Sequence, residues 1–440
     1  MACLVVVIDV GGPDPSTLKL LETTSLRGYI ALSHCWGKPT DEEKTQYCTT
    51  KENYQARLKG FSIDNLPKTF QDAVRITRAI GQSYLWIDAV CIIQMDQEDW
   101  GRESLSMEKV FSSAYCTISA DAAKNWTQGF LERKSPPKFI TTYKNGKMMY
   151  ACSTSHDFDN HVSRSELNKR AWVIQERFLS RRILHFAEDH TYFACGERVR
   201  CENFTTLISP KRKEYFIFDP AFPERLTEAG YERMLEFIQH MFKEYAQAGL
   251  TNRSDKEIAI SGLLQRMQDV IGSECVHGTF RCFLARLLLW RVSDTVTDNE
   301  VACSGDTEHG LPSWSWMSHD HIEFFPEHEF IDAPINANSF DSESQLHVRI
   351  FELELRDCYM EERGERHVLV QDDDQCIAQF WLDTHEKTQI QGCIVVGKSQ
   401  EHRWFVLLVT EIPRKRYKRF GVGEINWHYI SKTSSDGVLV

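Results

Sequence analysis

Strand-like and helix-like segments alternate through the first third of this 440-residue chain, and no other feature constrains its fold as strongly. The strand-like segments are residues 4–9, 28–33, 84–93 and 115–120. Apolar residues keep helical spacing between Pro67, a suitable first helical residue, and Gly81, where a left-handed cap can end a helix, and again over about 99–113. This β-α-β-α-β order predicts an α/β domain with a mostly parallel sheet and flanking helices.

Beyond this region the pattern changes twice. A helix and turn at 167–183 lead into strands at 183–186 and 191–195, helical spacing dominates 221–292, and strand-like alternation returns from Leu311. A chain of this length exceeds what one hydrophobic core usually supports. We therefore predict an α/β domain over 1–205, a mainly helical region over 206–310, and a β-rich region, as a sheet or barrel-like cap, over 311–440.

Composition argues against a nucleic-acid-binding, membrane-spanning or secreted protein. The formal net charge of −12 argues against salt-driven binding to nucleic acid, so the basic run 414–419 is expected to be a solvated hairpin or loop. No apolar run is long enough for a membrane-spanning helix, and residues 4–13 indicate a strand and turn instead of a signal peptide. The 14 cysteines form no CxxC pair, which favours reduced thiols. A cytoplasmic protein with no membrane contact is expected.

Polar residues cluster where two predicted strands end. Ser33-His34-Cys35-Trp36-Gly37 ends one strand, and Asp88 interrupts the apolar run 84–93. Because ligands of open α/β sheets bind at the carboxyl ends of parallel strands, we expect Ser33, Cys35 or Trp36 to lie near Asp88 in one concave site. A buried aspartate needs a donor, and Ser33, His34 or a backbone amide at a helix start could supply it.

Other chemistries are less favoured by the residues. Cys35 and His34 are neighbours on a strand and point to opposite faces, so they do not form a catalytic pair, and a buried, inert Cys35 is favoured. The combinations His185, His190, Cys195 and His319, His321 lack the compact spacing of a zinc site, so no metal is predicted. The sequence also lacks GxSxG, GxxxxGK[ST], HExxH and GxGxxG motifs.

Three blocks carry a family resemblance. They are Tyr29–Gly37, Leu66–Ala73 leading to Tyr84–Gln94, and Arg170–Ser180, followed by the shorter pieces 254–262 and 312–316. In order and spacing they resemble the fungal heterokaryon incompatibility (HET) family. The resemblance implies an effector of non-self recognition and cell death, with a protein partner possible in recognition. Because no recognition module is evident beside the blocks, a stand-alone effector or enzyme is expected.

The HET domain is in turn distantly similar to the TIR fold, which implies a TIR- or flavodoxin-like core. Many TIR domains cleave the nicotinamide–ribose bond of NAD with a glutamate near a Trp or Cys, and Asp99–Glu103 occupies a comparable place. The resemblance therefore implies Glu103 as the catalytic carboxylate, NAD as a possible substrate, and no resident cofactor. Glu176 is a second candidate, and Trp36 or Trp100 could stack on a base.

The candidate site residues follow from both arguments. The catalytic candidates are Glu103, Asp88, Glu176, Cys35 and His34. The candidates for contact with a small molecule or nucleotide are Ser33, Trp36, Gly37, Trp86, Gln94, Trp100, Trp172 and Gln175. Three functions stay open at this point: a cell-death effector, a HET-like scaffold acting as a small-molecule enzyme of secondary metabolism, and a non-catalytic interaction module.

Overall fold

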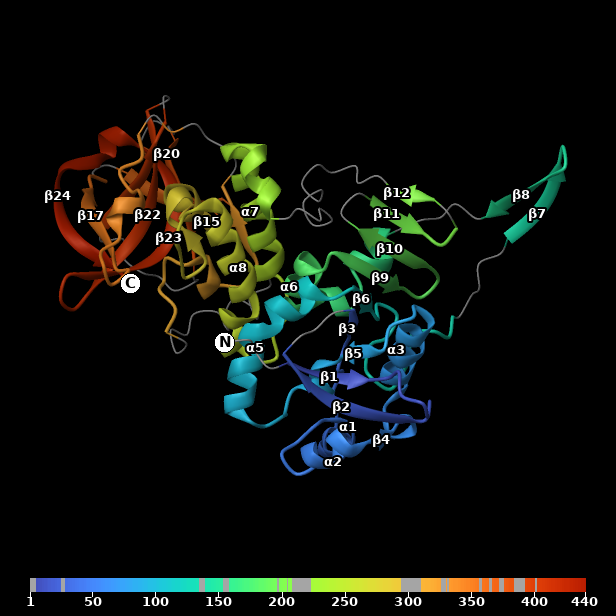
Figure 1. Cartoon of the computed structure of the whole chain (residues 1–440). Coiled ribbons are helices and arrows are strands. Elements are labelled where there is room, and N and C mark those ends of the chain that lie inside the picture. Colours follow the sequence, from blue (N-terminus) through green and yellow to red (C-terminus); the bar gives the residue numbers. More distant parts are fainter. Residues whose placement is uncertain are drawn as a thin grey trace. The chain divides into compact units, whose positions relative to one another are not determined.

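The computed structural model describes the chain in two compact units (Figure 1). The first comprises Met1–Glu228, Ala248–Thr251 and Ile258–Leu263, and the second comprises Ala229–Gln247, Asn252–Glu257 and Leu264–Val440. The boundaries expected near residues 205 and 310 stay predictions. The structure describes all residues except 1–4, 25–27, 134–138, 153–157, 196–197, 204, 208–222, 294–309, 326–329, 331, 356–357, 364–365, 372–375, 384–391 and 400–401.

A ten-stranded sheet in the order β12-β11-β10-β9-β6-β3-β5-β1-β2-β4 forms the centre of the first unit. Among these strands, β9, β6, β3 and β5 run parallel to one another, and antiparallel strands extend the sheet beyond β9 and beyond β5. The α/β class is confirmed, but the sheet is mixed and not mostly parallel, because β1 pairs with β2, and β10 with β9 and β11, in antiparallel register. Strands that lie this close in sequence can pair as antiparallel neighbours, whereas parallel neighbours need a longer crossover. The strands are β1 (Val5–Asp9), β2 (Thr17–Thr23), β3 (Tyr29–Ser33), β4 (Phe61–Ser62), β5 (Tyr84–Trp86), β6 (Cys116–Ser119), β9 (Arg182–Phe186), β10 (Thr191–Cys195), β11 (Arg198–Cys201) and β12 (Thr206–Leu207).

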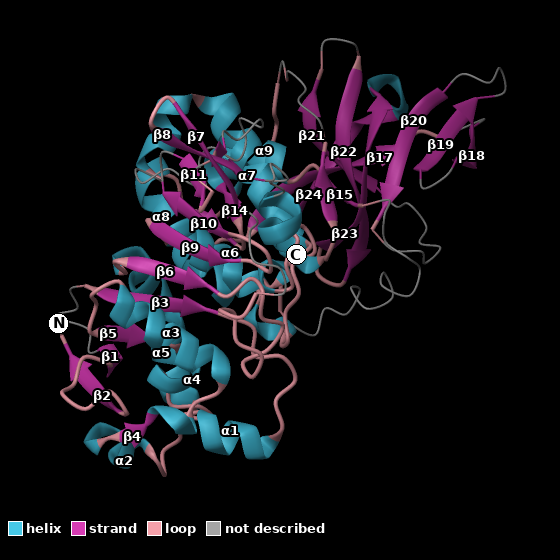
Figure 2. Ribbon diagram, turned by 90° about the vertical axis from the view of Figure 1, so that its right-hand side faces the viewer, coloured by secondary structure: helices cyan, strands magenta, loops and turns pink. Residues whose placement is uncertain are grey.

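Helices cover both faces of the parallel strands. On one face, the Tyr29 hydroxyl donates to the carbonyl of Val110, and Trp86 packs edge-on against Phe111 at 5.7 Å, so α5 lies there. On the other face, Phe70 brings α3 against the end of β3. The helices of this unit are α1 (Asp41–Tyr47), α2 (Tyr54–Lys59), α3 (Lys68–Ala79), α4 (Asp88–Cys91), α5 (Gln97–Ser113) and α6 (Ala171–Leu179). Figure 2 shows these helices beside the strands. A separate hairpin is formed by β7 (Phe139–Lys144) and β8 (Lys147–Cys152).

One helix boundary and one strand depart from the sequence prediction. Pro67 caps α3 and precedes its first residue, whereas Gly81 adopts the expected left-handed conformation with φ of 80°. The apolar run 84–93 is not one strand, because β5 ends at Trp86 and Asp88 begins α4. The Asp88 carboxylate accepts a hydrogen bond from the Ala89 amide at 2.7 Å, and such local bonding favours a helix start over a strand ladder.

The second unit is rich in strands, as predicted. Its eight-stranded sheet has the order β18-β19-β20-β23-β22-β21-β17-β24, and an added pairing of β23 with β24 closes five of these strands into a ring. Helices α7 (Tyr231–Ala246) and α9 (Leu284–Leu287) belong to this unit, and α8 (Ile258–Ile271) begins in the first and ends in the second. The strands are β17 (Leu346–Leu353), β18 (Cys358–Arg363), β19 (Arg366–Gln371), β20 (Cys376–Leu382), β21 (Gly392–Lys398), β22 (Arg403–Ile412), β23 (Arg416–Asn426) and β24 (Ile430–Leu439), with short strands β13 (Cys275–Val276), β14 (Thr279–Phe280), β15 (Trp290–Val292) and β16 (Ile322–Phe324).

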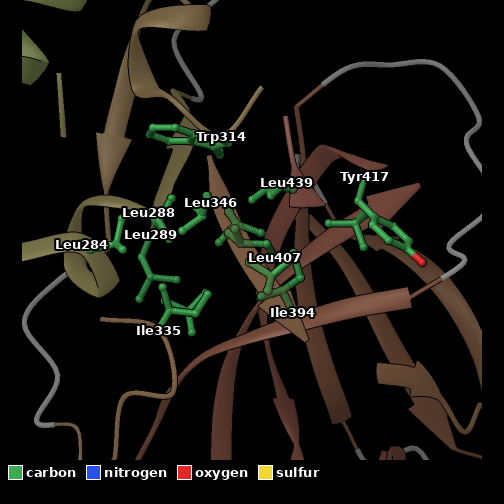
Figure 3. Close-up of a cluster of buried hydrophobic side chains, with 14 of the residues drawn as sticks. Leu284, Leu288, Leu289, Trp314, Ile335, Leu346, Ile394, Leu407, Tyr417 and Leu439 are labelled. Atoms are coloured by element: carbon green, nitrogen blue, oxygen red, sulfur yellow. The ribbon is translucent and has the colours of Figure 1, made fainter. Parts of the chain in front are cut away.

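The core of the second unit joins the ring of strands to α9 and its neighbours. Leu284, Leu288 and Trp314 come from the segments before the sheet, and Leu346, Ile394, Leu407 and Leu439 come from its strands (Figure 3). Burial of these side chains is the main favourable contribution to the stability of the unit. None of the described helices is long and apolar enough to cross a membrane.

The basic run 414–419 is only partly a solvated hairpin. Arg414 and Lys415 form the turn between β22 and β23 with left-handed φ values of 74° and 55°. Arg419, in contrast, is buried and paired with Asp383, so the prediction was wrong for this residue. The side chain points inward because it shares the buried face of β23 with Tyr417. The run Asp372-Asp373-Asp374, whose three charges predict an exposed turn, lies outside the described residues.

Candidate functional site

Two neighbouring parallel strands bring Trp36 and Asp88 together. Ala31 of β3 lies opposite Trp86 of β5, so the segments that follow the two strands leave the sheet side by side. The Trp36 indole Nε1 donates to Asp88 Oδ2 at 2.8 Å, and Asp88 Oδ1 accepts from the Ala89 amide. His34 Nδ1 lies 3.7 Å from Asp88 Oδ1. The donors that satisfy Asp88 are thus an indole and the predicted backbone amide at a helix start.

Ser33 and Cys35 lie on the other face of the sheet. The Ser33 hydroxyl is close enough to Glu176 of α6 to lower the pKa of that carboxyl, although no hydrogen bond between them forms. Cys35 packs with Leu167 and Val173. Successive strand residues face opposite sides, so the single predicted site is divided into an Asp88 side, with His34 and Trp36, and a Glu176 side, with Ser33 and Cys35.

Arg170 connects the two sides. Its Nη1 donates to the carbonyl oxygen of His34 at 2.6 Å, and its positive charge lowers the pKa values of Glu176, Cys35 and His34. On sequence proximity, Arg170 or Arg181 could pair with Glu176. The role of Arg170 in holding the end of β3 depends on a carbonyl group, which no residue pattern reveals.

A second buried polar pair was missed from the sequence. His185 Nδ1 lies 2.9 Å from Asp121 Oδ2, both side chains are fully buried, and Asn168 donates to Asp121 Oδ1 at 2.7 Å. The feature that could have revealed this pair is the alignment of residues on neighbouring strands. Ser33, Ser119 and His185 occupy one row across β3, β6 and β9. In parallel strands such a row shares one face, which places this pair on the Glu176 side.

Burial sets the protonation of the three central groups. It lowers the pKa of His34 to about 4, raises that of Cys35 to about 11, and raises that of Glu176 to about 7. At neutral pH the imidazole is therefore uncharged and Cys35 is a thiol, which is a poor nucleophile. With its pKa raised to about 7 by burial, Glu176 is a group on this side that can exchange a proton near neutral pH.

Glu103 does not join this cluster through any contact in the described residues. It lies on α5 with only 3% of its surface exposed, and Arg102 Nε donates to its Oε1 at 3.3 Å. Burial raises its pKa. Trp100 and Trp172 lie edge to face at 6.3 Å, joining α5 to α6. The resemblance to TIR domains implies Glu103 as the catalytic carboxylate, and that role stays a prediction.

Three further candidates hold the scaffold. Trp86 is fully buried under α5. Gln175 is also buried, and its Oε1 accepts from the Leu263 amide at 3.2 Å. Gln94 donates to the carbonyl oxygens of Asp88 at 3.1 Å and Ile92 at 3.2 Å, so it fixes the turn that carries Asp88. Of these three side chains, only that of Gln94 is partly exposed.

Gly37 allows the chain to turn after Trp36, and Gly37→Ala is expected to destabilise the first unit by about 2 kcal/mol. Gly37 has φ of 75°, and an added Cβ would lie 2.5 Å from Asn125 Cβ. Gly81→Ala is the matched control, because Gly81 has φ of 80° and open space around it. Urea unfolding of both variants separates the two effects, and equal losses would show that contact with Asn125 costs nothing.

The open part of the cluster consists of Asp88, Trp36 and Arg170. The Asp88 side chain is 28% exposed, and the other two residues are half-buried. A fixed carboxylate can accept hydroxyl groups or stabilise positive charge, a guanidinium can bind an anion, and an indole can stack. Within the described residues, no group of three His, Cys, Asp or Glu side chains is arranged to hold a metal ion.

Comparison with known proteins bears on the same residues. The family model described as heterokaryon incompatibility protein (HET) matches residues 29–176, a range that contains every candidate residue. The Neurospora crassa protein named heterokaryon incompatibility protein 6, OR allele, is 25% identical over 218 aligned residues, covering 41% of this chain and 30% of that protein. The match therefore spans less than a third of the relative's length. The chain gave no significant match to a solved structure.

Proposed function

This chain belongs to the heterokaryon incompatibility family through residues 29–176, and on that premise we propose that it is an effector of fungal non-self recognition that triggers cell death. The observation that carries the proposal is the coincidence of the family match with the buried polar cluster at the ends of β3 and β5. A relative named for heterokaryon incompatibility supports the same role.

The chemistry that fits the cluster best is cleavage of the bond between nicotinamide and ribose in NAD or a related nucleotide. Breaking an N-glycosidic bond develops positive charge on the sugar, which a preorganised carboxylate stabilises. Asp88 meets this requirement because Trp36 and the Ala89 amide fix both of its oxygens and its side chain stays partly exposed.

The other two carboxylates suit this role less well. Glu103 is almost fully buried and contacts Arg102. Glu176 is also buried, and its pKa of about 7 leaves it partly protonated at neutral pH. A group that must stabilise positive charge needs to be ionised and within reach of the sugar, so Asp88 is assigned that role. Glu176 is suited to holding a proton behind Ser33.

Arg170 supports a substrate with phosphate groups. Its guanidinium donates once to the His34 carbonyl oxygen, and it makes no other hydrogen bond to a described residue. Arginine binds phosphate oxygens with paired donors, and the bond to the His34 carbonyl oxygen holds the Arg170 guanidinium at the end of β3. A nucleotide with ribose at Asp88 and phosphate at Arg170 satisfies both groups.

Purified full-length protein incubated with NAD is expected to release nicotinamide, and Asp88→Asn is expected to lower that rate at least about 100-fold. The asparagine keeps the size and one acceptor of Asp88 but removes its negative charge. Trp36→Phe keeps an aromatic ring and removes the donor to Asp88, so an intermediate loss is expected. Glu103→Gln serves as the matched control and should retain most activity.

The outcomes separate the alternatives. Release by wild type that Asp88→Asn does not lower, while Glu103→Gln abolishes it, would move the site to α5. A folded wild type that releases no nicotinamide would reject NAD cleavage and leave a binding role for the same cluster. Folding of each variant is checked by circular dichroism before its rate is compared.

A further inference from the structure

Three aromatic rings of the first unit form a corner beside Asp88. Trp126 is 1% exposed and packs against two half-buried rings, those of Trp36 and Tyr47. The centroid of the Trp126 ring lies 5.3 Å from that of Trp36 and 5.6 Å from that of Tyr47. The Trp36 plane is tilted by 31° from Trp126, whereas the Tyr47 plane stands at 82° to it. The two half-buried rings are therefore steeply inclined to each other, and we call the three rings the aromatic corner.

Tyr47 of the aromatic corner is held close to Asp88. The amide of Thr49 donates to the carbonyl oxygen of Ala89 at 3.0 Å, which joins the segment after α1 to the start of α4. Burial and then the negative charge of Asp88 raise the pKa of the Cys48 thiol, so the carboxylate lies near the residue that follows Tyr47. The end of α1 and the start of α4 thus bring a half-buried tyrosine next to a partly exposed carboxylate.

Hydrogen bonds fix the positions of both half-buried rings. The guanidinium of Arg57 is buried and donates from Nη1 and Nη2 to the carbonyl oxygen of Tyr47, each at 3.1 Å. Its Nη1 also donates to Thr49 Oγ1 at 3.1 Å. Trp36 is fixed by its indole bond to Asp88 at 2.8 Å. Because these groups are ordered before a ligand arrives, binding costs little conformational entropy at the aromatic corner.

The charge at the aromatic corner favours a cationic ligand. Both oxygens of Asp88 already accept a hydrogen bond, one from the Trp36 indole and one from the Ala89 amide. A cation that carries its charge on an atom without hydrogens is attracted by this carboxylate and needs no further acceptor from it. His34 Nδ1 lies 3.7 Å from Asp88 Oδ1, but burial lowers the pKa of His34 to about 4, so its imidazole brings no competing positive charge at neutral pH.

We propose that the aromatic corner binds a flat aromatic cation, the pyridinium ring of an oxidised nicotinamide nucleotide. The inference rests on the proposed function, in which Asp88 serves the ribose attached to that ring. A flat cation stacks on an indole and is attracted by the electron-rich faces of aromatic rings. Trp36 supplies the stacking face, Tyr47 supplies a second ring inclined to it, and Trp126 supports both from the interior.

The charge of the ring then distinguishes substrate from product. When the bond between nicotinamide and ribose breaks, its electron pair stays with the ring nitrogen, and nicotinamide leaves as a neutral molecule. The positive charge passes to the sugar beside Asp88, where water adds and releases one proton. The aromatic corner therefore holds the charged substrate more tightly than the neutral product, because the attraction between cation and ring is lost on cleavage.

Binding of 1-methylnicotinamide to the purified full-length chain tests the inference without any cleavage. This ligand carries the pyridinium ring but no glycosidic bond, and nicotinamide is the matched ligand without the charge. Ligand-observed NMR titrations are expected to show at least about tenfold tighter binding of the cation. Tyr47→Leu should weaken binding of the cation at least about threefold, whereas Tyr47→Phe keeps the ring and should retain most of the affinity.

Tyr115→Leu is the matched control for Tyr47→Leu. Tyr115 is 45% exposed and precedes β6, and its amide donates to the carbonyl oxygen of Tyr29, the first residue of β3. It therefore lies at the amino ends of the parallel strands, at the edge of the sheet opposite to Trp36. Its substitution should leave the affinity for 1-methylnicotinamide unchanged, and an equal loss in both variants would overturn the assignment of Tyr47.

The other outcomes are equally decisive. Equal affinities for 1-methylnicotinamide and nicotinamide, or no binding of the cation at millimolar concentration, would overturn the inference. Tetramethylammonium has the charge without the ring and should bind more weakly, and tighter binding of this ion would overturn the assignment to an aromatic cation. Binding of 1-methylnicotinamide by a chain that leaves NAD intact would reject the proposed cleavage and support the inference. Cleavage of NAD by a chain that does not prefer the cation would do the reverse.

Discussion

Arg419→Ala is expected to lower the free energy of unfolding of the second unit by about 3–5 kcal/mol, the usual cost of breaking a buried ion pair. Arg419 Nε donates to Asp383 Oδ2 at 2.9 Å and its Nη2 to Oδ1 at 3.1 Å. The same guanidinium donates to the carbonyl oxygens of Leu288 at 2.8 Å and Trp290 at 2.5 Å. Removing it leaves a buried carboxylate and two buried carbonyl groups without their donor.

The magnitude is tested by urea unfolding followed by circular dichroism. Arg416→Ala is the matched control, because Arg416 is exposed on the same strand, and its effect should stay within about 0.5 kcal/mol. A double variant, Arg419→Met with Asp383→Leu, should recover most of the loss, since no unpaired charge is left buried. A loss below about 1 kcal/mol for Arg419→Ala would show that water reaches Asp383.

The sequence was sufficient for the elements that depend on local pattern. The helix after Pro67, the strand before Ser33 and the β-rich character beyond Leu311 all follow from spacing and turn residues. The meeting of Trp36 and Asp88 followed from one further rule, that parallel strands end at the same edge. The antiparallel extensions of the sheet depend on long-range pairing and were not predictable in this way.

The burial of individual side chains follows from helix and strand periodicity more than from their charge. Glu103 lies four residues before Met107 on α5, and both are buried on the same helix face, so the helical period could have predicted its burial. The alternation that separates Cys35 from His34 also sets Ser33 and His34 on opposite faces. Arg419 was assigned to solvent by its charge, although strand alternation with Tyr417 indicated the inner face.

Glu176→Gln is expected to stabilise the first unit by roughly 3 kcal/mol at pH 8 and by little at pH 5. Burial raises the pKa of Glu176 from 4.5 to about 7, while in the unfolded chain it titrates near its ordinary value. Between these values the folded protein holds more protons than the unfolded chain. The free energy of unfolding therefore falls as pH rises through this window. Above the window, the deficit in stability caused by the ionised Glu176 is constant. Glutamine mimics the protonated carboxyl at every pH, so it removes the deficit.

Comparing the free energies of unfolding of wild type and Glu176→Gln at each pH separates the contribution of Glu176 from those of the histidines. Burial lowers the pKa values of His34 and His319 to about 4, so both destabilise the folded chain as pH falls below about 6.5, in wild type and variant alike. Glu166→Gln is the control, because Lys169 lowers the pKa of that exposed carboxyl and its removal should bring no gain at pH 8. An equal wild-type-to-variant difference at pH 5 and pH 8 would show that Glu176 keeps one protonation state throughout. It would then lose the proton-holding role, and Asp88 alone would carry the chemistry of the cluster.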